Sequence, residues 1–352
     1  MRSKLLVTLA VFLCGCVAVN ACTTFCLTNK NEVLFGRNYD WGISDALVFV
    51  NKRGVAKVAT VGESPNPAKW ISKFGSVTFN QYGRENPTGG MNEAGLVVEQ
   101  MWLVETEYSN DGALPTLGSQ EWIQYLLDTS ATAEEAVRNA ARVRILSDVK
   151  VHYLVSDKAG NTAAIEFVSG KMVVHIGESL REAALTNDTY EKSISYKRGT
   201  ALEKANSAGS LDRFTRAAQK TALFPKLRKQ NQEAVEYAFE ILSNVENKGV
   251  TQWSIVYDLS RGRIYFRTLP SPQIKSIDMN GFDYSCGEPV KMFDMNAKIA
   301  GNVTVKFTDY TRKANRDLIE RSFNGTDFLK DVPRMERFYM ASYPESFACV
   351  TR

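Results

Sequence analysis

Residues 22–41 read CTTFCLTNKNEVLFGRNYDW, and this stretch predicts a β-hairpin that begins at a cysteine. Residues 22–27 and 33–37 are rich in the β-branched and aromatic side chains typical of strands. The residues between them, Asn-Lys-Asn at positions 29–31, favour a turn. A hairpin closed at this turn places its first residue opposite residues 37–39.

This register puts two charged side chains near the first residue, Cys22. Arg37 is expected beside the thiol, and Asp40 follows just beyond the pair, within reach of the backbone nitrogen of Cys22. On their own, Arg37 and Asp40 would be more typical of a surface ion pair at a strand end. What precedes Cys22 in the chain favours a chemical role instead.

The first 21 residues have the order of a signal peptide. Arg2 and Lys4 come first, an apolar run follows, and small residues end the segment at Val19-Asn20-Ala21. We therefore expect export, to a periplasm or to the outside of the cell, after a cut before Cys22. The mostly apolar stretch 5–19 is shorter than the roughly 20 residues that span a bilayer, so no stable membrane span is expected.

A second interpretation of the same segment is a lipoprotein signal. Residues 13–16 read Leu-Cys-Gly-Cys, which resembles the sequence at which bacterial lipoproteins are cut and lipidated. Cys16 would then carry the lipid, or less plausibly Cys22, and the protein would be a catalytically inactive surface lipoprotein with a binding role. The alternative is that these cysteines are small apolar members of the signal.

The scarcity of histidine limits how a nucleophile could be activated. The chain has two histidines, His152 and His175, each in an apolar run that predicts a buried strand. This weakens a Cys-His dyad, a Ser-His-Asp triad and a histidine zinc site together. A terminal cysteine needs no histidine, because its own α-amine titrates near pH 7.7 to 8.0. Arg37 would lower the pKa of the thiol, and Asp40 would orient the amine.

Composition and charge describe an ordinary globular protein. With 44% hydrophobic and 23% charged residues, the chain is neither collagenous nor disordered. A net charge of +4 gives no electrostatic case for nucleic acid or an anionic membrane as a partner. The spacing of Cys22, Cys26, Cys286 and Cys349 fits no zinc motif. Cys286 and Cys349 could form a disulfide that holds the C-terminus, or remain free.

Hydrophobic patterning predicts one α+β domain over residues 22–352, after the signal peptide at 1–21. No linker or repeat divides the chain. The helices and strands expected from periodicity are strands at Ala46–Val50, Val55–Val61, Ser76–Gln81, Gly95–Leu103, Val151–Ser156, Thr162–Val168, Lys171–Ile176, Trp253–Leu259 and Arg263–Thr268, and helices at Ser119–Asp128, Thr132–Val143, Arg213–Leu223, Gln232–Val245 and Lys313–Phe323.

Five short motifs in order resemble the choloylglycine hydrolase family of N-terminal nucleophile hydrolases. They are Cys-Thr at 22–23, GRNYDW at 36–41, GMNEAGL at 90–96, LTN at 185–187 and DRF at 212–214. The resemblance implies a cysteine nucleophile freed by processing, a four-layer αββα sandwich, and cleavage of a linear amide. It also implies no metal, no organic cofactor and a tendency to form homo-oligomers.

The resemblance also assigns roles within the site. Asn187 would hold the oxyanion, and Arg213 would support the charge of the site. Trp102 ends a predicted strand that we expect in the same sheet as the motifs, so it should lie near the nucleophile, and the alternative is a tryptophan of the core. It stands where bile-acid hydrolases of the family usually have Asn, and a large rigid indole favours packing against an aromatic or acyl group. We therefore expect a small-molecule amide substrate similar to penicillin V or a long-chain N-acyl amide, in preference to conjugated bile acids.

Overall fold

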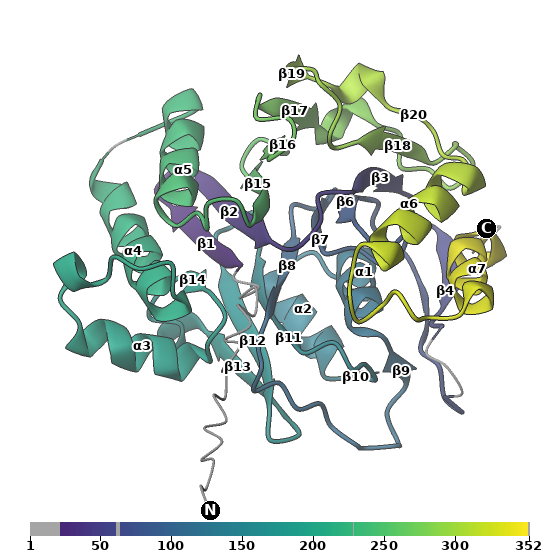
Figure 1. Cartoon of the computed structure of the whole chain (residues 1–352), viewed down its shortest axis with the longest axis horizontal. Helices are drawn as coiled ribbons and strands as arrows, with labels where there is room; N and C mark the ends of the chain where they lie inside the picture. The colour runs from purple at the N-terminus through teal and green to yellow at the C-terminus, as the bar shows by residue number, and fades with distance from the viewer. Residues whose placement is uncertain (1–21, 61–63, 228, 351–352) are drawn as a thin grey trace, which may run out of the picture.

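The computed structural model describes residues 22–60, 64–227 and 229–350 (Figure 1). The signal peptide expected at 1–21 and the lipidation site expected at Cys16 lie outside the described residues. Within them, no helix has the length and apolar character needed to cross a membrane.

One of the two large sheets has seven strands and contains the N-terminal hairpin. Its strands run in the order β14-β1-β2-β15-β16-β17-β19. Their bounds are β1 (Thr23–Thr28), β2 (Val33–Asp40), β14 (Ala184–Leu185), β15 (Thr251–Asp258), β16 (Arg263–Thr268), β17 (Lys275–Asp278) and β19 (Gly301–Asn302).

The hairpin of β1 and β2 has the predicted turn. Asn29 Oδ1 accepts hydrogen bonds from the backbone N–H groups of Asn31 and Glu32, so the side chain itself closes the turn. In the resulting register Thr24, not Cys22, pairs with Arg37. Because side chains alternate along a strand, Arg37 still lies on the same face of the hairpin as the cysteine.

The second large sheet has nine strands in the order β13-β12-β11-β8-β7-β6-β3-β18-β20. Their bounds are β3 (Leu47–Asn51), β6 (Ser76–Asn80), β7 (Gly89–Asn92), β8 (Val97–Trp102), β11 (Val151–Ser156), β12 (Thr162–Val168), β13 (Lys171–Ile176), β18 (Lys291–Asp294) and β20 (Thr308–Asp309). Small sheets add β9 (Thr116–Leu117) with β10 (Arg144–Ile145), and β4 (Val55–Val58) with β5 (Lys69–Ile71) and β21 (Ala348–Cys349).

Strand β7 was not predicted, because glycine is uncommon in strands and this strand begins with two. Its glycines are required by close approaches. A Cβ atom on Gly89 would fall on the carboxylate of Glu99 in β8, and one on Gly90 would lie 2.6 Å from the carbonyl oxygen of Val77. The predicted strand 95–103 starts later than expected, since Gly95 turns the chain with a φ of +88°.

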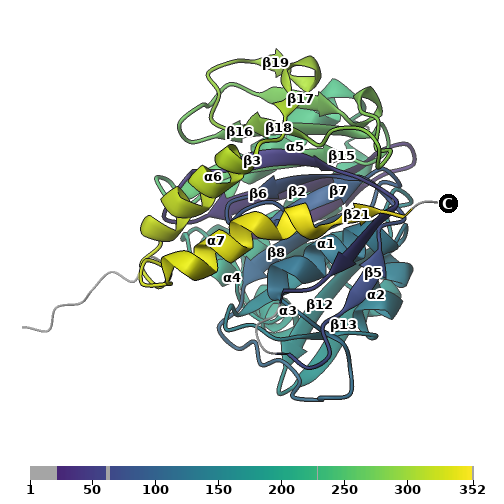
Figure 2. The same cartoon turned by 90° about the vertical axis from the view of Figure 1, so that its right-hand side faces the viewer.

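Helices cover the outer faces of both sheets (Figures 1 and 2). On the nine-stranded sheet lie α1 (Ser119–Thr129) and α2 (Ala133–Ala140), and Thr132 caps α2 by accepting from the backbone N–H of Glu135. On the seven-stranded sheet lie α4 (Ser210–Leu223) and α5 (Gln232–Asn244), with α3 (Tyr190–Gly199) packed on α4. Helix α3 was not predicted, because its apolar positions are too few to form a stripe.

The hydrophobic core lies where the two sheets face each other. Phe79 of β6 contacts Tyr257 of β15, with ring centroids 6.1 Å apart, and Thr24 of β1 donates to the sulfur of Met101 in β8. Cys26 likewise reaches Ser156 in β11, at 3.2 Å between Sγ and Oγ. Residues of both sheets belong to this one buried cluster.

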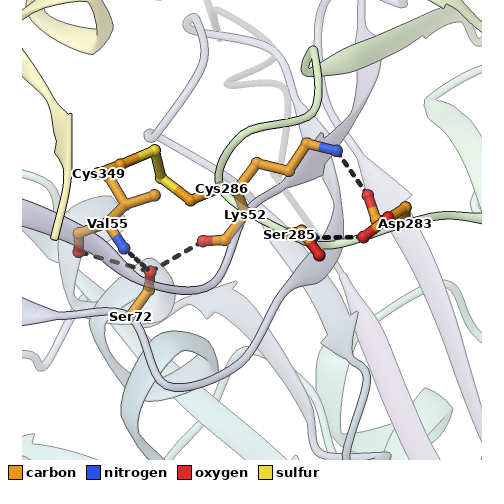
Figure 3. Close-up of a disulfide and its surroundings, with 7 residues drawn as sticks. All are labelled: Lys52, Val55, Ser72, Asp283, Ser285, Cys286 and Cys349. Carbon is orange, nitrogen blue, oxygen red and sulfur yellow. Dashed lines mark hydrogen bonds between the residues drawn. A yellow bond between two sulfur atoms is a disulfide. The ribbon is translucent and has the colours of Figure 1, made fainter. Parts of the chain in front are cut away.

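The C-terminal part of the chain packs beside the two sheets and returns to an early strand (Figure 2). The predicted helix 313–323 is present as α6 (Arg312–Asn324), while α7 (Arg334–Ser342) was not predicted. Strand β21 pairs with β4, and a disulfide joins Cys349 of β21 to Cys286, with Cα atoms 5.7 Å apart (Figure 3). The disulfide left open by the sequence is therefore formed in the structure.

We predict that Gly89→Ala destabilises the fold by about 1–3 kcal/mol, the usual cost of overpacking a buried site. The added methyl group would overlap the Glu99 carboxylate, which is held from other directions and cannot yield freely. Gly112→Ala is the matched control, because a Cβ atom there meets nothing within 4 Å. Denaturant unfolding measures both, and equal stabilities of the two variants would contradict this account.

Candidate active site

Cys22 directly precedes β1 and lines a cavity. Its side chain is 4% exposed, and its thiol lies 4.0 Å from the backbone carbonyl oxygen of Asp40. The cavity has a volume of about 570 Å³, which is within the range of small-molecule sites in proteins. The sulfur therefore sits where a bound small molecule could reach it.

Arg37 is buried between the two sheets, next to Cys22. Its guanidinium donates to the Glu99 carboxylate and to the backbone carbonyl oxygens of Thr88 and Gln100, at 3.0 and 3.1 Å. It also lies over the ring of Tyr39, 4.8 Å from the centroid. These contacts hold the cation in one place, so that its charge acts on the thiol from a fixed position.

Two opposing effects act on the thiol. Burial raises the pKa of Cys22, and the nearby Arg37 guanidinium lowers it by a smaller amount. The charge of Asp40 adds a further increase in the pKa. The sequence predicted that Arg37 would favour the thiolate, and the direction of that effect agrees, but burial outweighs it. The pKa of the thiol therefore lies above its usual value.

Asp40 ends β2 and is held on one side only. Thr251 donates to its Oδ1 at 2.6 Å, while Oδ2 is buried without a hydrogen-bond partner among the described residues. Burial raises the pKa of this carboxyl group to about 7, although Thr251 and the charge of Arg213 lower it. An unpaired buried carboxylate oxygen is costly, and a cationic donor at Oδ2 would relieve that cost.

Arg213 of α4 connects Cys22 with Asn187. Its guanidinium donates to the backbone carbonyl oxygen of Cys22 at 2.6 Å, to the Thr23 hydroxyl, and to Asn187 Oδ1 at 2.9 Å. Asn187 Nδ2 in turn donates to the backbone carbonyl oxygen of Trp102 at 2.8 Å. One chain of hydrogen bonds thus links Cys22 to Asn187 and to the end of β8.

Sequence reasoning missed Glu99, the partner of Arg37. It is fully buried, and burial raises the pKa of its carboxyl group to about 7, against the lowering effect of Arg37. The Tyr257 hydroxyl donates to its second oxygen. The available signal was a carboxylate in the middle of an apolar strand, Val97-Val98-Glu99, because such a charge must find a buried partner.

The two histidines are buried, as expected, but one of them lies behind the site. His152 Nε2 donates to the backbone carbonyl oxygen of Thr186 at 2.6 Å, directly before Asn187 in the chain. Its Nδ1 lies 3.0 Å from Glu166, whose carboxylate also accepts from the backbone N–H of Tyr190. Neither His152 nor His175 lines the cavity of Cys22.

Trp102 was expected near the nucleophile because it ends a strand of the same sheet, and that reason is wrong. Strand β8 belongs to the nine-stranded sheet and β1 to the seven-stranded sheet. The ends of the two strands meet because the sheets pack face to face, so Trp102 and Cys22 line one cavity. The Trp102 indole is half-buried and lies beside Trp41, with ring centroids 6.1 Å apart.

Comparison with known proteins agrees with this geometry. A profile described as "Linear amide C-N hydrolases, choloylglycine hydrolase family" matches residues 22–292, which include the cysteine, both arginines, Asp40 and Asn187. The chain belongs to the choloylglycine hydrolase family. Its members are hydrolases of linear amide C–N bonds, so this chain is identified as an enzyme of that class.

Individual relatives are similar over most of their length. The chain is 25% identical over 315 residues to a penicillin V acylase from Pectobacterium atrosepticum, which covers 75% of this chain and 82% of the relative. A penicillin V acylase structure from Agrobacterium tumefaciens has a TM-score of 0.74 at 30% identity, covering 82% and 98% of the two chains. A conjugated bile acid hydrolase variant from Clostridium perfringens, with a TM-score of 0.68 at 20% identity, shares the fold and covers 80% and 98%.

We predict that Arg37→Gln raises the pH midpoint of Cys22 alkylation by about one unit or more, because an adjacent cation lowers a thiol pKa by that order. The reaction with iodoacetamide is followed by mass spectrometry on chains that begin at Cys22. Lys30→Gln is the matched control, since it removes one positive charge from the exposed turn of the same hairpin. An unchanged midpoint in Arg37→Gln would show that the guanidinium does not act on the thiol.

Proposed function

We propose that this chain is an exported amidohydrolase in which Cys22, freed by cleavage after Ala21, is the N-terminal nucleophile. The order of helices, sheet, sheet and helices supports the four-layer αββα sandwich of N-terminal nucleophile hydrolases. The residues that would do the chemistry come together around Cys22, which lines the cavity. They are Cys22, Arg37, Asp40, Asn187 and Arg213.

The unpaired oxygen of Asp40 is the observation that carries this proposal. Cleavage before Cys22 would create an α-amine on a residue whose thiol lies 4.0 Å from the backbone carbonyl oxygen of Asp40, and Asp40 Oδ2 is buried with no donor among the described residues. The amine takes the thiol proton and becomes an ammonium group, which donates to Asp40 Oδ2. This satisfies the oxygen, favours its ionised form, and holds the amine beside the sulfur.

The reaction then runs in two steps. The Cys22 thiolate attacks the amide carbonyl carbon, and the ammonium returns its proton to the leaving nitrogen as the C–N bond breaks. Water then attacks the acyl-thioester, which releases the carboxylic acid and restores the thiol. Asn187 Nδ2 carries two N–H groups, of which one is directed to Trp102, so that the other can donate to the oxyanion.

The cavity favours an apolar acyl group. The aromatic side chains of Trp41, Trp102 and Phe328 line the cavity and contact one another. Among the described residues that line it, the charged ones are Glu121 and Glu336. An uncharged aromatic or aliphatic acyl group fits such a surface better than an anionic group. Similarity to two penicillin V acylases supports a phenoxyacetyl amide or a long-chain N-acyl amide as substrate.

Export is supported by the cysteines as well as by the order of residues 1–21. A disulfide between Cys286 and Cys349 suits an oxidising compartment, in which structural disulfides persist. The alternative of an inactive surface lipoprotein is less well supported, because the hydrogen bonds of Arg213 to Cys22 and Asn187 suit a site built around the cysteine. The intact mass and N-terminal sequence of the exported protein separate the two.

We predict that Cys22→Ser abolishes nearly all amidase activity with the unfolding curve unchanged, because a hydroxyl group is much harder to deprotonate than a thiol. The matched control is Cys26→Ser, since Cys26 is the other free buried cysteine and does not line the cavity. A chain that retains Ala21 should be equally inactive, because its amine is tied up as an amide. Full activity of that chain would place the base elsewhere.

We also predict that wild-type enzyme has a higher kcat/KM for penicillin V or a long-chain N-acyl amide than for glycine- or taurine-conjugated bile acids. Trp102→Asn should shift this ratio towards bile acids, because the indole that packs against the acyl group is lost. Side-by-side kinetics on the three substrates measure it. A wild-type preference for taurocholate would contradict the assignment, and an unchanged ratio would make Trp102 a core residue only.

A further inference from the structure

The C-terminal segment supplies one wall of the catalytic cavity, although it lies beyond the residues that match the family. The match ends at residue 292, and the cavity is lined by Phe323 of α6, by Phe328, Leu329 and Val332 of the connection to α7, and by Met340 of α7. The opposite wall comes from the earlier, matched part of the chain. The shape of the cavity therefore depends on both parts.

Phe328 forms a group of three neighbouring aromatic rings with Trp41 and Trp102, and all three line the cavity. Its ring centroid lies 6.2 Å from that of Trp41, edge to face, and 6.4 Å from that of Trp102. Its side chain is 56% exposed, which is unusual for a phenylalanine that lies in a lined cavity. A ligand packed over Phe328 and Trp102 would cover this apolar surface and gain the corresponding free energy.

Hydrogen bonds hold this wall to the rest of the fold. Arg337 of α7 is 4% exposed and donates to the backbone carbonyl oxygens of Lys330 and Val332, at 2.6 and 3.0 Å. These hydrogen bonds fix the connection between α6 and α7. Tyr82, itself a lining residue, lies 3.1 Å from the Thr326 hydroxyl. These contacts hold the connection on both sides of Phe328 and Leu329, and so they fix the positions of these two residues.

The far end of the segment is attached by three contacts. Strand β21 pairs with β4, and the disulfide between Cys349 and Cys286 joins the segment to the loop before β18 (Figure 3). The Tyr343 hydroxyl donates to the backbone carbonyl oxygen of Val58, also in β4. The segment 326–340 therefore keeps its place against the cavity without help from a ligand.

We propose that residues 326–340 form the acyl-selectivity wall of this enzyme, with Phe328 as its main specificity-determining residue. An extended or aromatic acyl group packs over the rings of Phe328 and Trp102 and against Leu329 and Val332, while a short acyl group bonded to Cys22 does not reach this wall. The wall discriminates by the length of the acyl group and not by the leaving group. This inference rests on the proposed function of Cys22 as the nucleophile.

The test compares two amides that share a leaving group, the 4-nitroanilides of acetic and decanoic acids. Phe328→Ala should lower the decanoyl-to-acetyl ratio of kcat/KM at least tenfold, with the acetyl value changed less than twofold. Phe338→Ala is the matched control, because it removes the same exposed side chain from α7 outside the cavity and should leave the ratio unchanged. An equal ratio in wild type and Phe328→Ala would overturn the proposal.

A binding experiment separates failure of this inference from failure of the proposed function. Decanamide is titrated into Cys22→Ala, with and without Phe328→Ala, and the fluorescence of Trp41 and Trp102 reports binding. If the wild type cleaves neither nitroanilide and Phe328→Ala still weakens decanamide binding at least tenfold, the nucleophile assignment fails and the wall stands. If decanamide binds equally with and without Phe328, the wall is refuted whatever the activity.

Discussion

The buried ion pair between Arg37 and Glu99 is the contact on which the rest of the site depends. It joins β2 of one sheet to β8 of the other, with both side chains fully excluded from solvent. Two buried charges are costly unless further hydrogen bonds hold them, and here the carbonyl oxygens of Thr88 and Gln100 and the Tyr257 hydroxyl supply such bonds. Arg37 Nε is buried without a hydrogen-bond partner among the described residues. Removing either partner would leave an uncompensated charge in the core.

This cross-sheet contact sets the electrostatics around Cys22. The cation that lowers the pKa of Cys22 cannot turn towards solvent, because its carboxylate partner is fixed in the opposite sheet. Burial works against ionisation of the same thiol, so a base next to the sulfur is needed. Asp40 has one oxygen bonded to Thr251, and its other oxygen has no hydrogen-bond partner among the described residues, so in the proposed function Asp40 holds this base.

In the proposed function, the chemistry and the selection of the substrate belong to different parts of the chain. The residues linked to Cys22 by hydrogen bonds lie before residue 214, whereas Phe328 and the rest of its wall follow residue 322. The disulfide and β21 return the end of the chain to β4, so the later part packs against the earlier one. Such an arrangement lets the acyl pocket change in size without moving the groups around the sulfur.

The sequence by itself determined what depends on neighbours along the chain: the hairpin turn at Asn29, the closeness of Cys22, Arg37 and Asp40, and the main helices and strands. Alternation and turn chemistry act over a few residues, so they can be recognised without a structure. Only the tertiary structure decided the partner of Arg37, the meeting of Trp102 with Cys22, the glycine-rich strand β7, and the place of Phe328. These contacts join residues far apart in sequence, and they exist because two sheets pack face to face and the C-terminal segment packs against them.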